Sequence, residues 1–290
     1  MIAYFNGDFL EKDEITISPD DRGFLFADGL YEVIRSYRGK LFRAQDHIER
    51  LNYGAGRLCL ETRDFSYLEQ VAQDLLKKNE LKGDATVYFQ ITRGTAPRGH
   101  AFPDPPPAPT VFCTAALLDP TQTMDSRENG IQVITVADTR WAGCDIKTTA
   151  LTANVLANQE AVEKGAKEAL FVRDGVVMEG THSNFFAVAD GCLVTAPASN
   201  YILHGITRKV VLELADAKGV KVNQAPVFTS GLPRITEAFI TGTTTEITPV
   251  ISIDGIPVGT GTPGPVTRTI QDGFLDLIMD KDAPFIENTK

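Results

Sequence analysis

The sequence lacks the features that would mark a membrane-spanning, secreted or zinc-binding protein. It contains no run of about 18 apolar residues, so we expect no membrane-spanning helix. The first residues, MIAYFNGDFLEKDE, lack the basic region and the apolar core of a secretory signal. The four cysteines are scattered without a CxxC spacing, at Cys59, Cys113, Cys144 and Cys192. We therefore expect reduced thiols, no zinc site and a cytoplasmic location.

Positive charge is also scarce. The chain of 290 residues has 28 lysines and arginines against 38 acidic residues, which gives a net charge of −10. This balance argues against nucleic acid as a partner, and a protein of this charge that binds small anions must gather its positive charge locally. The hydrophobic fraction of 43% and the charged fraction of 23% are typical of a globular protein.

Helix-like and strand-like segments follow one another along the chain and predict an α/β (α+β) fold with two domains. Hairpin turns are predicted at three Asn-Gly or Asp-Gly pairs, which begin at Asn6, Asp174 and Asp190. Helical periodicity covers residues 44–58, 67–81, 206–220 and 265–280, and a proline-rich loop covers residues 95–109. A polar stretch that begins at Asp119 follows the strand-like segments of the first half of the chain. We therefore expect a small N-terminal α/β domain (1–118), a linker (119–124) and a larger C-terminal domain (125–290).

Lys147 stands between the segment RWAGCDI and a helix-like stretch. The apolar spacing of that stretch is near helical at Leu151, Val155, Leu156, Gln159 and Ala161. A solvated lysine at a helix N-terminus is the ordinary explanation, but a helix N-terminus disfavours a cation. A lysine amine is nucleophilic only when it is neutral, and burial lowers its pKa toward that state. Such a lysine commonly forms a Schiff base with a carbonyl substrate or with pyridoxal phosphate. One lysine alone leaves both explanations open.

A second candidate group lies in the segment VMEGTHSNFF. Glu179 ends an apolar run after a predicted turn, and the small polar residues Gly180, Thr181 and Ser183 follow. An exposed acid at a strand end is the ordinary interpretation of this segment alone. The alternative is a carboxylate that keeps a pyridine nitrogen protonated, because a pyridinium is the electron sink of a pyridoxal cofactor.

Two further segments could bind anions. Ile206 and Thr207 begin a predicted helix after a glycine, where backbone N–H groups form an anion site, although a simple helix cap explains them equally well. Arg98 and His100 flank a glycine in the proline-rich loop, and arginine is suited to grip a carboxylate. Other donors are the hydroxyls of Thr243 and Thr244 and the guanidinium of Arg50.

Together these segments resemble the fold type IV pyridoxal-phosphate aminotransferases and, within them, the bacterial D-amino-acid branch. The resemblance covers nearly the whole chain, through DRGFLFADGLYEV, HIERL, YFQITRGTAPRGH, RWAGCDIK, NQEA, MEGTHSNFF, GITR and TTTEITPV. The D-specific branch is indicated by PRGH together with Tyr31 and Tyr88. The chain departs from the D-specific pattern at Thr181 and His182, where that pattern has small serines, so the substrate range can differ.

The resemblance implies the following roles. Lys147 would carry pyridoxal phosphate as a Schiff base and act as the general base, and Glu179 would pair with the pyridine nitrogen. The phosphate would be bound by Arg50, Ile206, Thr207, Thr243 and Thr244. The substrate would lie against Tyr31, Tyr88, Arg98, His100 and Ser183, with Tyr31, Arg98 and His100 on its α-carboxylate.

The implied reaction moves an amino group from a D-amino acid, such as D-alanine, D-glutamate or D-aspartate, to 2-oxoglutarate or pyruvate. The resemblance also implies a homodimer in which Arg98 and His100 reach the active site of the neighbouring subunit. The alternatives of the same fold are a branched-chain L-amino-acid aminotransferase, an R-selective amine transaminase and aminodeoxychorismate lyase. A more distant alternative is a non-catalytic protein that binds a phosphorylated ligand.

Overall fold

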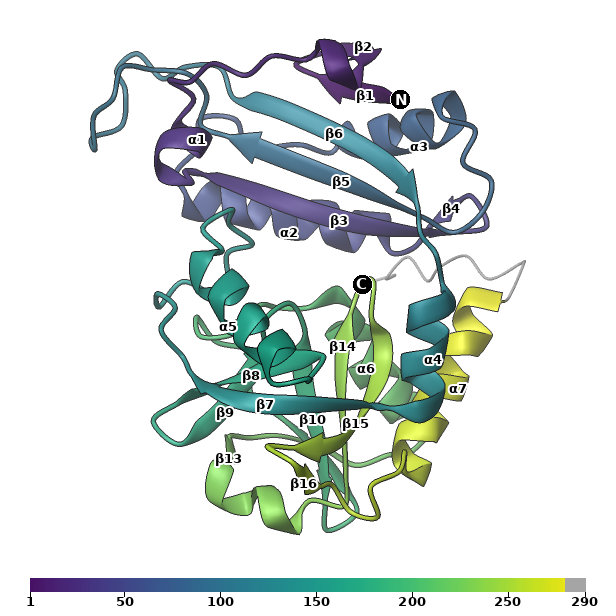
Figure 1. Ribbon diagram of the computed structural model, residues 1–290. Helices are drawn as coiled ribbons and strands as arrows, with labels where there is room; N and C mark the ends of the chain where they lie inside the picture. Colours follow the sequence, from purple (N-terminus) through teal and green to yellow (C-terminus); the bar gives the residue numbers. More distant parts are fainter. Residues whose placement is uncertain (280–290) are drawn as a thin grey trace. The chain divides into compact units, whose positions relative to one another are not determined.

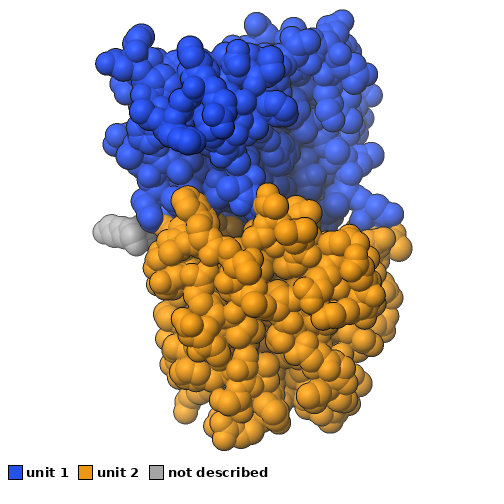
Figure 2. Space-filling model, turned by 60° about the vertical axis from the view of Figure 1, so that its left-hand side comes forward, with its two compact units in different colours: residues 1–119, 146–151 blue, residues 120–145, 152–290 orange. Residues whose placement is uncertain are grey.

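A computed structural model of the protein describes residues 1–279, which divide into two compact units. Unit 1 contains residues 1–119 and 146–151, and unit 2 contains residues 120–145 and the chain from residue 152 onward. The two units are coloured separately in Figure 2. Each unit has its own sheet and its own hydrophobic core.

Unit 1 is built on a six-stranded antiparallel sheet with the strand order β2-β1-β6-β5-β3-β4. Its strands are β1 (Ile2–Phe5), β2 (Asp8–Glu11), β3 (Gly29–Tyr37), β4 (Lys40–Leu41), β5 (Ala85–Thr92) and β6 (Thr110–Leu117). One face is covered by α2 (Ala44–Arg57) and α3 (Leu68–Lys78) (Figure 1). Alternate residues of the central strands, such as Ile34, Val87 and Phe89, enter this core. The residues between them, such as Tyr31 and Tyr88, point to the opposite face.

The predicted turn at Asn6 is confirmed. It joins β1 to β2, and Asn6 and Gly7 have φ values of 48° and 110°, which Asn and Gly tolerate best. A short helix, α1 (Arg22–Phe26), precedes β3 and is capped by the Asp21 side chain, which accepts the Gly23 N–H at 2.7 Å. A 3₁₀ helix covers Lys12–Glu14.

The described residues of unit 2 contain ten strands. They are β7 (Ile131–Ala137), β8 (Glu168–Arg173), β9 (Val176–Gly180), β10 (Asn184–Ala189), β11 (Cys192–Thr195), β12 (Val222–Gln224), β13 (Val227–Phe228), β14 (Glu237–Gly242), β15 (Glu246–Ile253) and β16 (Ile256–Pro257). The order β10-β14-β15-β7-β8-β9 closes on itself because Asn184 of β10 also pairs with Glu179 of β9. The predicted Asp-Gly turns at Asp174 and Asp190 are confirmed between β8 and β9 and between β10 and β11.

Four α-helices and a 3₁₀ helix complete unit 2 as far as residue 279. They are α4 (Thr121–Asn129), α5 (Thr152–Glu163), α6 (Ile206–Ala217), α7 (Pro265–Met279) and the 3₁₀ helix Thr229–Arg234. The last helix was expected to reach residue 280, which lies outside the described residues. None of the helices that the structure describes is both long enough and apolar enough to span a bilayer.

The units differ from the expected domains in two ways. Residues 119–124 do not form a simple linker, because α4 begins at Thr121. Residues 146–151, which include Lys147, join unit 1 although we expected them in the C-terminal domain. Backbone bonds explain this, since Tyr31 N–H donates to Lys147 C=O at 3.0 Å and Thr149 N–H donates to Gly29 C=O at 3.1 Å.

The helix-like stretch after Lys147 is confirmed as α5, and its apolar residues divide into buried and exposed ones. Ala157 and Ala161 are buried in a small cluster against Phe171, whereas Val155 and Leu156 are 63% and 66% exposed. Small side chains allow this helix to lie close to β8, and its larger apolar residues are directed away from the unit.

Candidate active site

Lys147 is held in an extended segment beside the start of β3, not at a helix N-terminus. Thr148 forms a bridge with Leu30, and its hydroxyl donates to the Gly29 carbonyl at 3.0 Å. The Lys147 Nζ lies 4.3 Å from the centroid of the Tyr31 ring, within the range of a cation–π contact. α5 begins only at Thr152. The backbone of β3 therefore fixes the lysine over an aromatic face.

The open face of the unit 1 sheet forms a cleft beside this lysine. Its volume is about 830 Å³, and its lining includes Tyr31, Tyr88, Gln90, Phe112 and Leu151. The rings of Tyr31 and Tyr88 stack with their centroids 6.0 Å apart, and the Tyr88 hydroxyl donates to Gln90 at 2.7 Å. Burial raises the pKa of Tyr88 to about 12, so its hydroxyl stays protonated at neutral pH. Two of the predicted substrate residues, Tyr31 and Tyr88, thus share one wall.

Arg50 belongs to a buried charged cluster in unit 1. Its Nε and Nη2 donate to the two carboxylate oxygens of Glu32 at 2.6 and 2.9 Å, and His47 Nδ1 lies 2.8 Å from Glu32 Oε2. Burial opposes the charge of Glu32, but Arg50 and His47 outweigh it and lower its pKa. Burial lowers the pKa of His47, and although Glu32 opposes this effect, the positive charges of Arg50 and Lys147 add to it. Sequence reasoning singled out Arg50 and missed both of its partners.

Arg98 and His100 lie together on the surface of unit 1. Both are exposed, and both lie against Phe26 of α1, with Arg98 Cζ 5.3 Å and the His100 ring 5.6 Å from the phenyl centroid. In the described part of the chain, no carboxylate forms an ion pair with Arg98. The guanidinium is therefore exposed and without an acidic partner, as a carboxylate-binding group requires.

Glu179 is the buried acid at the end of β9 in unit 2. Its Oε1 accepts Arg140 Nη1 at 2.5 Å, and its Oε2 accepts Asn184 Nδ2 at 3.0 Å and the Leu203 N–H at 2.9 Å. Arg140 also donates to Asp138 at 2.9 Å. Burial alone would lower the pKa of Arg140, but Asp138 and Glu179 outweigh this effect and raise it. Glu179 is therefore a paired carboxylate and not the exposed acid of the ordinary interpretation.

Asn184 connects Glu179 to the N-terminus of α6. Its Nδ2 also donates to Leu203 C=O at 2.9 Å, and a Cβ on Gly205 would come within 2.0 Å of its Oδ1. Glycine is therefore required at the residue before α6. Since glycine offers no side-chain cap, the first N–H groups of the helix, those of Ile206 and Thr207, point outward from its end. This is the arrangement that binds anions.

Threonines at the end of β14 lie next to this region. Thr241 pairs with Asn184 across the β10–β14 ladder, so both side chains share one face. Its hydroxyl is buried and has no hydrogen-bond partner among residues 1–279, and the same holds for the hydroxyl of Thr245. Half-buried Thr243 and Thr244 lie in the turn between β14 and β15. Buried hydroxyls without partners are uncommon in proteins and indicate a site for a polar group.

The Ser183 hydroxyl is engaged in a hydrogen bond with a neighbouring side chain. Its hydroxyl donates to the buried Glu168 at 2.9 Å, and the Thr181 hydroxyl donates to the same carboxylate at 2.5 Å. His182 is half exposed, with its Nδ1 3.0 Å from the Thr181 hydroxyl. The larger residues of this segment are thus accommodated by a carboxylate that sequence reasoning did not identify.

The structure brings the predicted residues together in separate groups within each unit. In unit 1, Lys147 joins Tyr31 and Tyr88, and Arg98 joins His100. In unit 2, Glu179 is connected through Asn184 to the end of β14 and the start of α6. Sequence reasoning missed Arg140 and Asn184. Arg140 lies in a segment that we singled out for its lysine, but nothing in that segment reveals a partner 39 residues away.

The comparisons of this chain with known proteins all identify aminotransferases. The family model of amino-transferase class IV matches residues 29–253. A D-alanine aminotransferase of Staphylococcus haemolyticus is 42% identical over 285 residues, covering 97% of this chain and 99% of the relative.

Solved structures of similar fold are branched-chain amino acid aminotransferases. The enzyme from Escherichia coli superposes with a TM-score of 0.88 at 27% identity, covering 100% of this chain and 99% of the other. The T.th. enzyme in complex with N-(5'-phosphopyridoxyl)-L-glutamate gives a TM-score of 0.87 at 27% identity, covering 96% of this chain and 93% of the other.

Proposed function

This chain belongs to the class IV aminotransferases, and we propose that it uses pyridoxal phosphate to move the amino group of a D-amino acid to a 2-oxo acid. D-alanine, D-glutamate and D-aspartate are the proposed donors, and 2-oxoglutarate or pyruvate is the proposed acceptor. The choice of D-amino acids rests on the 42% identity to a D-alanine aminotransferase over 97% of this chain. The chemistry rests on the residues of the two units.

The residues of unit 2 fit the phosphate and ring of this cofactor. The N–H groups of Ile206 and Thr207 point outward from a helix that has no side-chain cap. The Thr241 hydroxyl, which has no hydrogen-bond partner among residues 1–279, lies on the same face as Asn184, which contacts the residue before that helix. We assign the phosphate to this region of unit 2, with Thr243 and Thr244 as further donors. The phosphate contact expected of Arg50 stays a prediction, because its guanidinium donates to Glu32 within unit 1. When bound, pyridoxal phosphate supplies an electron sink for the bonds at the substrate α-carbon.

Lys147 and Glu179 carry the proposed chemistry. The Lys147 amine would hold the cofactor and would take the α-proton of the amino donor as general base. In the second half-reaction the same amine returns a proton to the α-carbon of the oxo acid. Glu179 would hold the pyridine nitrogen in its protonated form, and its carboxylate is paired with the Arg140 guanidinium.

The observation that carries the proposal is the pair Arg98 and His100. Two exposed donors on one loop, the arginine without an acidic partner among the described residues, suit a substrate α-carboxylate. Tyr31 is the third proposed carboxylate group, and Tyr88 lines the same cleft of unit 1. The substrate contact expected of Ser183 stays a prediction, because its hydroxyl donates to Glu168 within unit 2. A carboxylate held at one edge decides which face of the α-carbon turns toward Lys147, and therefore which enantiomer reacts.

We also propose a homodimer in which Arg98 and His100 serve the site of the neighbouring subunit. Val155, Leu156 and Val162 leave an apolar face of α5 exposed, with Val162 57% exposed. Exposed apolar patches of this kind mark protein interfaces. The single chain has a mass of 31.6 kDa, and light scattering on the purified protein should give twice this mass. A monomer at micromolar concentration would exclude the shared site.

A cytoplasmic location is proposed from the cysteines. All four are free thiols in the structure, as expected in a reducing compartment. Cell fractionation with a C-terminal tag tests this proposal, and recovery outside the cytoplasm would overturn it.

A second candidate is a branched-chain L-amino-acid aminotransferase, favoured by the solved structures of similar fold. A panel of D- and L-amino acids, each with 2-oxoglutarate and with pyruvate, separates the two. Our proposal expects D-alanine, D-glutamate or D-aspartate to react much faster than its mirror image. Faster reaction of L-leucine or L-valine would establish the second candidate.

A further inference from the structure

Asp28, which follows α1 in unit 1, is shared by two arginines. Its Oδ2 accepts Arg22 Nε at 2.8 Å and Arg93 Nε at 2.7 Å, and its Oδ1 accepts Arg93 Nη2 at 3.0 Å. Both arginines are buried. Burial opposes the charge of Asp28, but hydrogen bonds from Arg93 and Arg22 outweigh it and lower its pKa. One carboxylate thus fixes two guanidinium groups in defined orientations.

Arg22 extends from this carboxylate to the loop that carries Arg98 and His100. Its Nη1 donates to Gly99 C=O at 2.6 Å and lies 3.4 Å from Ala101 C=O. These are the residues directly after Arg98 and His100. Arg22 therefore holds the backbone of the loop while Phe26 supports its side chains.

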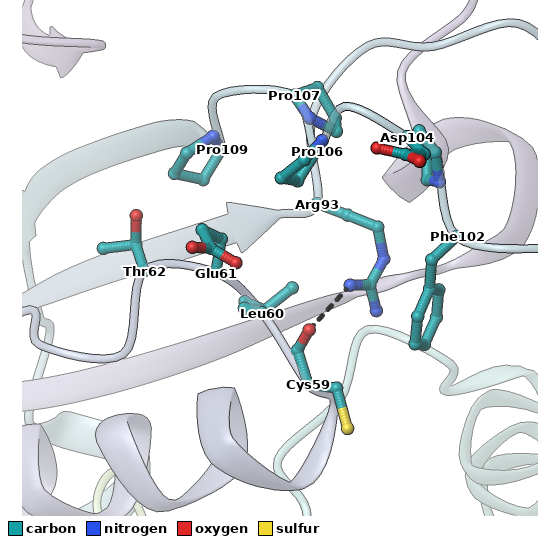
Figure 3. A pocket seen from close by; sticks show the side chains of 11 residues that line it. Cys59, Leu60, Glu61, Thr62, Arg93, Phe102, Asp104, Pro106, Pro107 and Pro109 are labelled. Atoms are coloured by element: carbon teal, nitrogen blue, oxygen red, sulfur yellow. Dashed lines mark hydrogen bonds between the residues drawn. The ribbon is translucent and has the colours of Figure 1, made fainter.

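Arg93 fixes the next part of the same loop. Its guanidinium lies 3.8 Å from the centroid of the Phe102 ring and donates to Cys59 C=O at 3.1 Å and to Leu58 C=O at 2.7 Å. Figure 3 shows Arg93 between Phe102 and Cys59, beside the prolines of the loop. Arg93 thus connects the loop to the end of α2, as Arg22 connects it to α1.

We propose that Asp28, acting through Arg22 and Arg93, is a positioning residue that sets the Arg98–His100 pair for carboxylate binding. Asp28 touches neither substrate nor cofactor in this role. It determines how well the substrate carboxylate is bound and leaves the proton transfer at Lys147 unchanged. The inference rests on the proposed function for its substrate, but the restraint of the loop can be tested without activity.

The principal variant is Asp28→Asn, which keeps the shape of the side chain and removes its charge. KM for the D-amino acid and for the 2-oxo acid should rise roughly 2- to 30-fold, while kcat stays within about twofold. Arg22→Lys is a second variant that keeps a buried positive charge. A lysine amine cannot reproduce the planar fork that reaches both Asp28 and Gly99, so KM should rise in the same direction.

The matched control is Asp84→Asn. Asp84 also pairs with a buried arginine of unit 1, Arg35, at 3.1 Å, but it lies at the other end of β3 and β5 from Asp28. Its substitution should leave both KM values unchanged. In an Arg98→Ala, His100→Ala background, Asp28→Asn should change KM by less than about twofold, because the groups it positions are gone.

Tryptic cleavage after Arg98, followed by mass spectrometry of the intact chain, gives a readout that needs no substrate. Asp28→Asn should accelerate this cleavage severalfold, and Asp84→Asn should not. An unchanged cleavage rate, or equal acceleration at all arginines and lysines, would overturn the inference. So would a fall in kcat without a change in KM. If the wild-type protein does not react with D-amino acids but cleavage responds as expected, the proposed function fails and the restraint of the loop stands.

Discussion

At the scale of single residues, the surroundings of Glu179 and Lys147 suit the role proposed for each. Glu179 faces a guanidinium, a side-chain amide and a backbone N–H, and these donors match an ionised carboxylate. Lys147 lies over the Tyr31 ring in a segment that β3 holds in an extended form.

Lys147→Ala should lose nearly all transamination, because one amine both holds the cofactor and moves the proton. General acid–base catalysis alone contributes roughly 10²- to 10⁴-fold, so the turnover should fall by at least that factor. Steady-state rates and the visible absorbance of the purified protein measure the two losses. Lys164→Ala is the control, since Lys164 forms an exposed pair with Glu160 at 2.7 Å. Wild-type turnover without added amine would exclude Lys147 as the catalytic lysine.

Glu179→Gln should retain the cofactor but slow proton removal from the amino donor. A charged hydrogen bond contributes about 1.5–3 kcal/mol, which corresponds to roughly 10- to 100-fold in rate if it acts in the transition state. Single-turnover spectroscopy with a good amino donor measures this step. Glu163→Gln, at an exposed residue of α5, should react as the wild type does. An unchanged single-turnover rate would remove Glu179 from the proposed chemistry.

At the scale of elements, the sequence predicts what is encoded within a few neighbouring residues. The turns at Asn6 and Asp174 are confirmed because each requires a positive φ at two adjacent residues. The start of α6 after a glycine is also confirmed. The helix α5 is confirmed, but its spacing does not reveal which face is buried, because packing against β8 decides this. The contact between Arg140 and Glu179 depends on the arrangement of strands, which no local pattern contains.

Helix α7 provides a stability prediction at this scale. The buried Glu237 of β14 accepts the N–H groups of Val266 and Thr267 at 3.0 and 2.8 Å and the Thr267 hydroxyl at 2.8 Å. Glu237→Gln removes the negative charge and one acceptor at this helix N-terminus, and should lower the free energy of unfolding by about 1–3 kcal/mol. Urea unfolding measures the loss, with Glu160→Gln as the exposed control. Activity should persist, because Glu237 lies at the opposite end of β14 from Thr241.

At the scale of the whole molecule, the proposed catalytic groups are divided between the units, with Lys147 and Arg98 in unit 1 and Glu179 in unit 2. The division could not be predicted from the sequence, because Lys147 follows a segment of unit 2 and joins unit 1 through backbone hydrogen bonds. The proposed dimer also divides these groups between two chains, since it assigns Arg98 to the active site of the neighbouring subunit.

Subunit exchange tests this assignment. Lys147→Ala and Arg98→Ala homodimers should each be weakly active, and co-expression should make about half of the dimers mixed. If Arg98 serves the neighbouring subunit, each mixed dimer has one intact site and one site with both defects, so activity on a D-amino acid should rise well above either parent. If Arg98 serves its own subunit, no site is restored. Differentially tagged mixed dimers without regained activity would therefore contradict the shared site.

The most direct measurement of the central claim is exchange of the alanine α-proton in D₂O, followed by NMR in the presence of pyruvate. Alanine and pyruvate interconvert without net change under these conditions, so loss of the α-proton signal reports proton removal alone. We predict rapid loss of the signal from D-alanine with the wild-type enzyme, little loss from L-alanine, and no loss from either with Lys147→Ala. Faster exchange of L-alanine, or exchange of D-alanine that persists in Lys147→Ala, would contradict a D-amino-acid aminotransferase that uses Lys147 as its base.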